Sequence, residues 1–282
     1  MSLNNSEIKS ERTKETIITV ILLLGAVIFL YPFLLVLINP VKKSIEILYN
    51  PYSFPKQIIF DSIREVLLNK TLDIFRLYKN SIIVTFASVF LVVILNPLVS
   101  YALAKIRFTG RELLFRIMLI TMMLPSVMLL IPTYMIMDQL KWVDTYKVMI
   151  IPGVLNVMYI FLFRQFISQI PDAFLEAAKI DGANHFGIFT KIVYPLMTPV
   201  IAATIVMEAT SRWNDLFTPL MYLKSEEMFT LQLGLFRFQD NMDMSRLGER
   251  WVATALVTIP MVIVYIVFQK YFIRAFSSTG LK

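Results

Sequence analysis

Residues 16–39 read TIITVILLLGAVIFLYPFLLVLIN, a run without a single charged side chain. An α-helix needs roughly 20 apolar residues to cross the hydrocarbon core of a bilayer, because lipid offers no partner to an unpaired backbone amide. The run is much longer than the apolar core of a secretory signal, and no small-residue cleavage pattern follows it. It therefore predicts a retained first membrane span.

The composition of the rest of the chain agrees with a membrane location. Of the 282 residues, 57% are hydrophobic and only 17% are charged, and the mean hydropathy is +0.68. Soluble domains carry about 45–50% apolar and about 25% charged residues. The net charge of +7 suits loops that face anionic headgroups better than it suits nucleic acid. We predict an integral membrane protein without a nucleic-acid partner.

Five further apolar runs are long enough to be spans. They cover residues 81–104, 117–137, 148–167, 196–223 and 251–273. Several contain proline, which membrane helices tolerate because neighbouring groups pair the freed carbonyls. The predicted fold is an all-α integral membrane protein with six transmembrane helices. A tail at 1–15 precedes the transmembrane domain at 16–273, and a tail at 274–282 follows it.

Residue types needed for most chemistry are scarce. The chain has no cysteine and one histidine, His185. This excludes disulfides and cysteine-ligated metals, and it argues against a histidine-based catalytic triad or metal site. We expect no catalytic residue, no metal and no cofactor in this chain.

The polar stretch at 169–195 lies between the fourth and fifth predicted spans. Pro171 and Asp172 form a helix-start signal, and Gly182 predicts a left-handed turn between two short helices. Ala177 and Ala178 give the first helix an unusually close-approach surface. One interpretation is a helix-turn-helix that docks a protein partner, and the other is an amphipathic connector that rests in the headgroups.

The same stretch resembles the EAA loop of ABC importer permeases, in the MalG-like sugar-importer branch. The motif positions that match are Glu176, Ala177, Ala178, Asp181, Gly182, Ala183, Phe189, Ile192 and Pro195. One departure is Tyr194, where the family pattern usually has leucine. Weaker matches are Trp213-Asn214 and the C-terminal residues 277–282.

The resemblance implies a location and a mechanism. Such permeases have six helices in the bacterial cytoplasmic (inner) membrane, with the EAA loop and both termini in the cytoplasm. The Lys/Arg bias of the loops does not decide this orientation by itself, because the two sides carry equal numbers. The loop would be a coupling helix inserted into a separate ATPase. Gly182 and Gly187 have phosphate-loop spacing, but Ile188-Phe189 replaces the required Lys-Ser/Thr, so ATP and Mg belong to a partner.

The resemblance also implies the remaining partners. These are a second, MalF-like permease subunit, a dimer of ATP-binding subunits and an extracytoplasmic solute-binding protein. The substrate class would be a sugar or oligosaccharide. The sequence leaves open whether that is a maltodextrin, a glycerol phosphate, an alginate oligosaccharide or another compound.

Polar residues inside the spans are candidates for a translocation pathway, because charges in a bilayer usually face a bundle interior or water. The candidates are Glu208, Arg212, Asn214 and Asp215 in the fifth span, Asn96 in the second and Asn156 in the fourth. Glu208 and Arg212 lie four residues apart and can pair. The pair is either a structural lock or part of a hydrophilic pathway, and the two roles are compatible.

The polar segment 224–250 would lie outside the membrane. Its apolar side chains are candidates for contact with the solute-binding protein, namely Phe229, Leu235, Phe236 and Phe238. The alternative is an interfacial amphipathic segment. For the whole chain, the rival functions are a secondary transporter, or another polytopic membrane protein that uses the 169–195 loop for a different partner. A secondary transporter is expected to show inverted repeats, and we find no convincing internal repeat.

Overall fold

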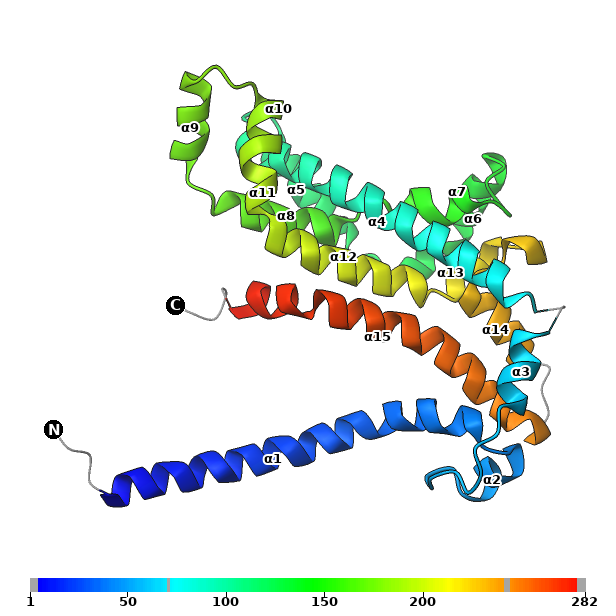
Figure 1. Cartoon of the computed structure of the whole chain (residues 1–282). Coiled ribbons are helices and arrows are strands. Elements are labelled where there is room, and N and C mark those ends of the chain that lie inside the picture. The colour runs from blue at the N-terminus through cyan, green and yellow to red at the C-terminus, as the bar shows by residue number, and fades with distance from the viewer. Residues whose placement is uncertain (1–4, 70–71, 241–243, 278–282) are drawn as a thin grey trace. The chain divides into compact units, whose positions relative to one another are not determined.

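The computed structural model describes residues 5–69, 72–240 and 244–277, and all regular structure in these residues is helical. Residues 1–4 of the predicted N-terminal tail and residues 278–282 of the C-terminal motif lie outside this range. The chain divides into two compact units, Met1–Leu72 with Phe238–Leu256 and Asp73–Arg237 with Val257–Lys282. Figure 1 labels the helices.

The first unit contains the long helix α1 (Asn5–Ile38) and three short elements that follow it, η1 (Asn39–Val41), α2 (Ser44–Tyr49) and α3 (Asp61–Leu67). From the other end of the chain it includes η6 (Met244–Arg246) and the start of α15 (Leu247–Ser277). Helix α3 contacts η1, and α2 contacts η6. Only 6% of the most apolar window of α1 is buried, as expected for a helix whose solvent is lipid.

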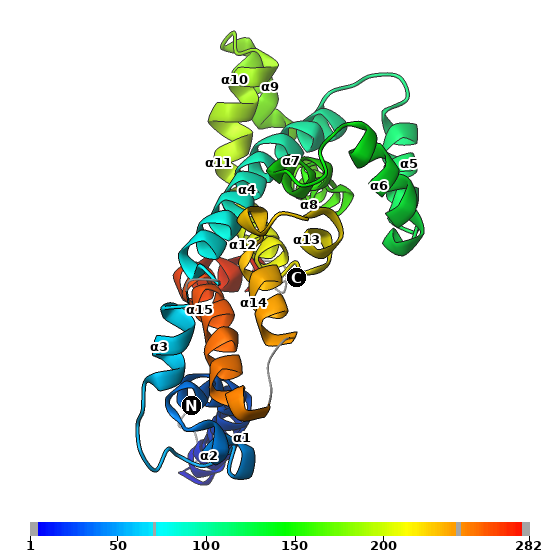
Figure 2. The ribbon, with the colours of Figure 1, turned by 90° about the vertical axis from the view of Figure 1, so that its right-hand side faces the viewer.

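The second unit is built on α4 (Ile74–Lys105). This helix packs along α8 (Val157–Ser168) and α12 (Thr198–Trp213), so the three form the centre of the unit (Figure 1). Helix α9 (Asp172–Ile180) and α10 (His185–Ile188) lie beyond the C-terminal end of α4 (Figure 2). The candidate site is therefore at one end of the three-helix core.

Four helical segments are long and apolar enough to cross a membrane. They are Lys14–Val41, Ile74–Lys105, Tyr146–Ser168 and Leu247–Gln269. A fifth candidate is a pair bent by 76°, His185–Leu196 with Thr198–Trp213. These segments overlap five of the six predicted spans, so the multi-pass helical architecture is confirmed and the count of six is not.

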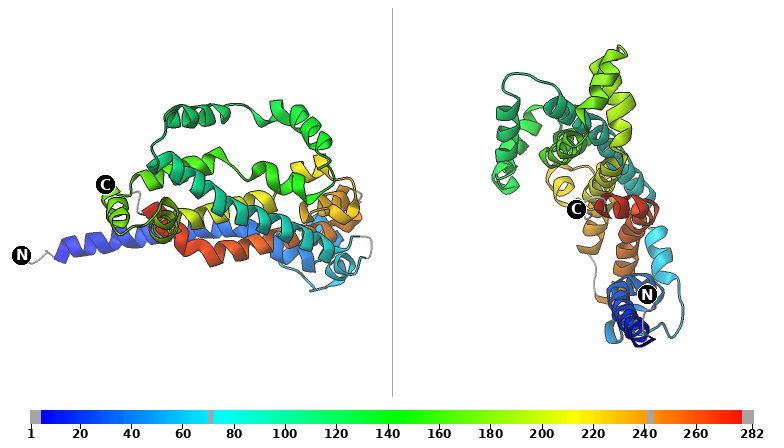
Figure 3. Two further views of the ribbon diagram at one scale, coloured as in Figure 1. Left: turned by 90° about the horizontal axis from the view of Figure 1, so that it is seen from above. Right: turned by 90° about the vertical axis from the view of Figure 1, so that its left-hand side faces the viewer.

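The predicted span at 117–137 does not form one helix. The chain there folds as α5 (Arg111–Thr121), η2 (Ser126–Leu129) and α6 (Leu130–Gln139), which together make an arch beside α4 and α8 (Figure 3). Pro125 lacks an N–H and disfavours a helical conformation at the residue before it, which favours the break seen here between α5 and η2.

The predicted span at 196–223 is displaced toward the N-terminus. Helix α12 stops at Trp213, and a separate short helix, α13 (Phe217–Tyr222), follows. Helical structure also precedes it, in η4 (Phe189–Val193), which is a π-helix, and α11 (Tyr194–Leu196). Pro195 lies inside this stretch, and the 76° bend comes between Leu196 and Thr198. Proline and π-turns are both recognised causes of helix kinks.

The remaining elements surround the core of the second unit. Short helices α7 (Tyr146–Ile150) and η3 (Ile151–Gly153) precede α8, and η5 (Glu226–Met228) and α14 (Leu231–Asp240) follow α13. The break between α7 and α8 contains Pro152 and Gly153, both poor residues for a helix interior.

Candidate functional site

Local sequence explains where α9 begins and ends. Pro171 is extended, and Asp172 opens the helix with a carboxylate near the positive end of its dipole. At the other end Gly182 has φ +82°. The Gly182 N–H donates to the Lys179 carbonyl at 3.0 Å, and the Ala183 N–H donates to the Ala178 carbonyl at 2.9 Å. This is a Schellman motif, so the left-handed turn predicted at Gly182 is confirmed.

Helix α9 has one buried and one exposed apolar face. Leu175 and Ala178 are 5% and 9% exposed, whereas Ala173, Ala177 and Ile180 point to the opposite side and are exposed. At spacings of four and three residues these three share one stripe. The small side chains of Ala173 and Ala177 allow a partner to approach closely, and the stripe ends on the large apolar side chain of Ile180.

The nine predicted coupling residues are divided by this geometry. Exposed positions are Glu176, Ala177, Asp181, Gly182 and Pro195, half-buried ones are Ala183 and Ile192, and buried ones are Ala178 and Phe189. The buried pair supports the loop from inside. Only the exposed and half-buried residues are available to a partner.

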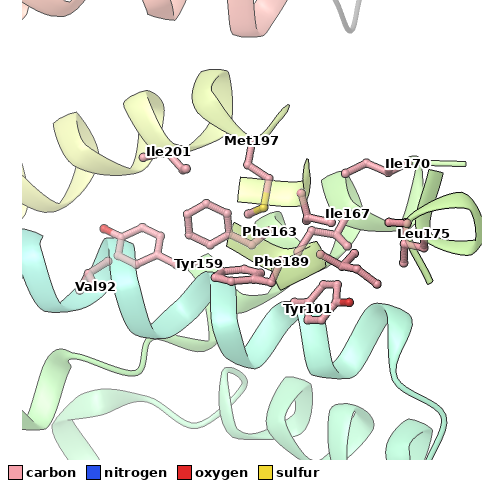
Figure 4. Close-up of a cluster of buried hydrophobic side chains, with 13 residues drawn as sticks. Val92, Tyr101, Tyr159, Phe163, Ile167, Ile170, Leu175, Phe189, Met197 and Ile201 are labelled. Atoms are coloured by element: carbon pink, nitrogen blue, oxygen red, sulfur yellow. The ribbon is translucent and has the colours of Figure 1, made fainter. Parts of the chain in front are cut away.

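A cluster of buried side chains joins α9 to the three-helix core (Figure 4). Leu175 and Ile170 continue a cluster that contains Phe163 and Ile167 of α8. Phe189 of η4 packs against Tyr101 of α4, with ring centroids 5.4 Å apart. The inner face of the loop is thus part of the same apolar core as the membrane helices.

The only histidine of the chain lies at this junction. The Tyr101 hydroxyl and His185 Nδ1 are 3.1 Å apart, and the two rings meet edge to face. Asn184 accepts a hydrogen bond from the Gly187 N–H at 2.8 Å and so caps α10. His185 therefore connects the start of α10 to α4 through Tyr101.

One ion pair connects α4 directly to α9. Lys105 Nζ lies 2.6 Å from Asp172 Oδ1 and donates to the Ile170 carbonyl oxygen, also at 2.6 Å. The hydrogen bond and charge of Lys105 hold the pKa of the Asp172 carboxyl below its usual value. Asp172 therefore stays ionised at physiological pH.

A polar cavity of about 590 Å³ lies between α9 and the segment that follows α4. Its charged and polar lining comes from Lys105, Arg107, Arg111, Asp172, Glu176, Lys179 and His185. Both signs of charge are present. The cavity leaves the flank of α9 that carries Glu176 and Lys179 open.

The predicted intramembrane pair is present in α12. Arg212 Nε donates to Glu208 Oε1 at 2.6 Å, and Arg212 Nη1 donates to the Met149 carbonyl oxygen at 3.0 Å. Glu208 is 2% exposed. A Cβ atom on Gly153 would lie only 1.8 Å from Arg212 Nη2, so Gly153 makes room for the guanidinium.

Arg212 also borders a second cavity, of about 520 Å³, in the same unit. Its lining is mostly apolar and includes Thr133, Thr218, Phe217 and Tyr222. Tyr222 stacks on Tyr134, with centroids 5.6 Å apart. The Glu208–Arg212 ion pair therefore links α12 to the α7 region and also borders this cavity.

The other pathway candidates have local structural partners. Asn96 is fully buried; its amide donates to the Val92 and Val154 carbonyls, and its oxygen accepts from the Asn156 N–H. The Asn156 side chain caps α8 through the Met158 N–H. Asp215 caps α13 through the Thr218 N–H, and Asn214 accepts from Gln232 Nε2. Asn96 does not line a pathway in this conformation, because no part of it is exposed.

The sequence predicts that residues 224–250 lie outside the membrane, and we call them the outer segment. Its first part is held in place by residues that the sequence analysis did not single out. Asn80 donates to the Glu227 and Phe229 carbonyls, and Ser81 accepts from the Leu231 N–H. Asp144, at φ +60°, accepts from both N–H groups of Lys224 and Ser225.

The predicted binding-protein contacts differ in exposure as a result. Phe229 and Leu235 are 9% and 1% exposed, and Phe236 is 42% exposed. Phe238 is half-buried. Phe229 and Leu235 therefore anchor the segment within this chain, and Phe236 is the most available of the four.

No group of three or more potential metal ligands occurs among His, Asp and Glu side chains in the part of the chain that the structure describes. The site is instead a surface helix on an apolar support, connected to helices that cross the membrane. Such an arrangement suits mechanical coupling of a membrane protein to a partner.

A family comparison defines the class more closely. Residues 96–278 match the family described as binding-protein-dependent transport system inner membrane component, and the chain belongs to that family. It is similar to the arabinooligosaccharides transport system permease protein AraQ of Bacillus subtilis (strain 168), at 31% identity over 94% of this chain and 95% of AraQ. It is also similar to the sn-glycerol-3-phosphate transport system permease protein UgpE of Brucella suis biovar 1, at 30% identity over 92% and 94%.

A solved structure agrees. The crystal structure of a bacterial ABC transporter involved in the import of the acidic polysaccharide alginate includes a chain with a TM-score of 0.81 and 28% identity. That match covers 96% of this chain and all of the other. The predicted resemblance to permeases of sugar importers is confirmed. The chain is a membrane permease subunit and not an enzyme, and the ATPase of such transporters is a separate subunit.

Proposed function

We propose that this chain is the permease subunit of an ATP-driven importer of a saccharide, and that α9 couples it to the ATPase. The observation that carries the proposal is the two-sided construction of α9. Its inner face, at Leu175 and Ala178, is buried, while Ala177 and its neighbours on the outer face are exposed beside the rigid turn at Gly182. A helix that only rested in headgroups would not need so close-packed a support.

The proposed topology has six passages across the membrane. Four are the long apolar segments described above, the fifth is the bent pair that ends in α12, and the sixth is the interrupted α5–α6 region. Both termini and α9 lie in the cytoplasm in this scheme, and the permease lies in the bacterial inner membrane. The family description supports the inner-membrane location, and the EAA resemblance supports the orientation.

The partners follow from the same proposal. A second permease subunit completes the translocation pathway, two ATP-binding subunits hold ATP and Mg, and a solute-binding protein delivers substrate outside. The named substrates of the relatives support a saccharide or a phosphorylated polyol. Glu208, Arg212 and the cavity beside them are the best-placed elements of the pathway, and Phe236 is the best-placed contact for the binding protein.

The test introduces a charge into the outer stripe of α9. Ala177→Asp places an unpaired carboxylate in the proposed contact, where burial without a partner is costly. Thr109→Asp is the matched control, because Thr109 is also exposed and lies on the same side of the membrane but outside α9. Substrate uptake and co-purification of the ATPase are measured for both variants in the assembled transporter.

We expect Ala177→Asp to insert normally, to lose uptake and to retain the ATPase poorly, while Thr109→Asp resembles the wild type. Normal uptake by Ala177→Asp would contradict the coupling role. A second test uses the purified chain alone, which should not hydrolyse ATP; turnover by the chain free of partners would contradict the proposal.

A further inference from the structure

Helix α9 is connected to the membrane helices in several ways. The chain joins it to α8 before it and, through α10, η4 and α11, to α12 after it, and Leu175 and Ala178 pack in the shared apolar cluster. A direct polar connection to α4 is made by the side chain of Lys105, the last residue of that helix. No backbone route links α9 closely to α4, because Lys105 and Asp172 are 67 residues apart in the sequence.

The Lys105 side chain is buried, and its ammonium group has two acceptors. Its side chain is 7% exposed, and Nζ contacts both the Ile170 carbonyl and the Asp172 carboxylate at 2.6 Å. These two acceptors bracket Pro171, the residue that precedes α9. One ammonium group therefore fixes both the end of the connecting segment and the first residue of the helix.

The charges suit the helix ends that they occupy. Lys105 lies at the C-terminus of α4 and Asp172 at the N-terminus of α9, so each charge is favourable to its own helix dipole. The Asp172 side chain is 69% exposed, so water screens the pair from that side and reduces what the pair adds to stability. The contact is therefore better suited to fix a geometry than to stabilise the fold.

The end of α4 that carries Lys105 is itself connected to α8, and α8 is connected to α5. Ser100, one and a half turns before Lys105, donates to the Ile160 carbonyl of α8 at 2.9 Å, and Arg164 of α8 donates to the Leu103 carbonyl at 3.2 Å. Arg164 also pairs with Glu112 at 2.7 Å and lies over the Phe115 ring. Any displacement passed to the end of α4 is thus shared with α8 and α5.

We infer that Lys105 is a positioning residue that ties the start of α9 to the end of α4, so that a displacement of α9 moves α4 together with α12. The inference rests on the proposed coupling role of α9 and adds a specific second connection to it. Without Lys105, α9 remains attached at Leu175 and Ala178 but its first turn is free to move independently of α4.

The experiment measures ATP hydrolysed per substrate imported by the reconstituted transporter, together with co-purification of the ATPase. Lys105→Met keeps the apolar stem and removes the tie. Lys105→Arg keeps the charge. Lys79→Met is the matched control, because Lys79 is an exposed cation on the same helix, α4, that lies outside the coupling loop and makes no ion pair in the described residues.

For Lys105→Met we expect the ATPase to co-purify normally and the ATP consumed per substrate to rise about 2- to 30-fold, the range found for residues that carry coupling between sites. Lys105→Arg should restore most of the coupling, and Lys79→Met should match the wild type. Asp172→Asn, at an exposed position, should give a smaller rise, because the Ile170 contact remains. It serves as the test if Lys105→Met does not fold.

Two results separate this inference from the proposed function. If Lys105→Met and Asp172→Asn both keep the wild-type ratio while Ala177→Asp is uncoupled, Lys105 has no positioning role and α9 is still the coupling helix. If Ala177→Asp is silent, the proposed function itself fails. A rise with Lys79→Met equal to that with Lys105→Met would also overturn the inference, because it would indicate a general effect of charge.

Discussion

The hydroxyl of Tyr194 donates a hydrogen bond to the carbonyl oxygen of Val93, at 3.3 Å. In an uninterrupted helix that carbonyl would accept from the residue four positions later, which is Pro97 and has no N–H. The tyrosine therefore supplies the partner that the proline removes. This gives a physical reason for the tyrosine at the one position where the loop departs from the leucine of the family pattern.

Tyr194→Phe should destabilise the protein by about 0.5–1.5 kcal/mol, the usual net value of one such hydrogen bond. In a Pro97→Ala background the same change should cost less, because the alanine N–H can pair with Val93. Thermal unfolding of the four proteins in detergent completes this double-mutant cycle. Equal costs in both backgrounds would show that the hydroxyl does not compensate for the proline.

Asn96 is the second test of the α4 interior. Asn96→Leu should destabilise by about 1–3 kcal/mol, because the Val154 carbonyl and the Asn156 N–H lose their buried partner. Transport should fall only as far as the amount of folded protein falls, and the apparent affinity for substrate should not change. A large change in the apparent affinity for substrate at normal stability would indicate that Asn96 lines the pathway.

The Glu208–Arg212 pair predicts that removing one partner costs more stability than removing both. Arg212→Met leaves the buried Glu208 carboxylate without its partner, which typically costs about 3–5 kcal/mol, whereas a double change to Glu208→Gln and Arg212→Met should be milder. Exchanging the two residues should preserve more function than neutralising either. The rescue should be incomplete, because a glutamate at 212 cannot donate to the Met149 carbonyl.

Gly153→Ala provides an independent check on the same pair. The added methyl group would displace the Arg212 guanidinium from its two bonds, so this small substitution should reproduce part of the Arg212→Met defect. Unfolding and uptake are measured beside Gly25→Ala, whose Cβ would meet nothing within 4 Å. A silent Gly153→Ala would indicate that the arginine can move without cost.

Features that depend on neighbouring residues were predictable from the sequence. The long apolar runs gave α1, α4 and α15, and Pro171 and Gly182 gave the limits of α9. Features that depend on what lies beside a residue in space were not. Pro97 and Pro125 both interrupt apolar runs, but Pro97 has Tyr194 beside it and its helix continues, while at Pro125 the helix ends.

The same limit applies to the site. Asn96 in an apolar run fits a pathway or a tie between helices equally well, and only the position of Asn156 decides between them. Lys105 was recognisable as a basic residue at a helix end, yet its partner Asp172 is distant in the sequence. Phe229 and Leu235 were predicted to be exposed contacts. They are buried because the outer segment bonds to Asn80 and Ser81, which lie far away in the sequence.

Asp144 gives a prediction for pH. Burial alone would raise the pKa of its carboxyl, but hydrogen bonds from Ser225 and from the Lys224 N–H, together with the Lys224 charge, hold the pKa below the ordinary value of 3.8. A depressed pKa stabilises the folded state above the unfolded-state value, and this contribution is lost as the pH falls through the folded-state value. The anchoring of the outer segment should therefore be constant from pH 5 to pH 8.

Asp144→Ala removes three acceptor interactions and should lower the unfolding temperature at both ends of that range by the same amount. Asp144→Asn keeps a carbonyl acceptor and tolerates the positive φ, so its effect should be smaller. A defect that appeared only at pH 5 or only at pH 8 would mean that another group governs the segment.

Gly182 yields the most discriminating prediction for the coupling helix. A Cβ at this position would meet no atom within 4 Å, so any penalty comes from the backbone at φ +82° and amounts to about 1–2 kcal/mol for an ordinary residue. Asparagine tolerates this conformation best and a β-branched residue worst. The loss of coupling should therefore increase in the order Gly182→Asn, Gly182→Ala, Gly182→Val, while membrane insertion is unchanged, because the turn lies outside the apolar segments.

Uptake and ATP hydrolysed per substrate are measured for the three variants. A series ordered by side-chain volume with Asn worse than Ala would show that the side chain itself disturbs the partner, and equal wild-type values for all three would mean that the geometry of the turn does not matter for coupling.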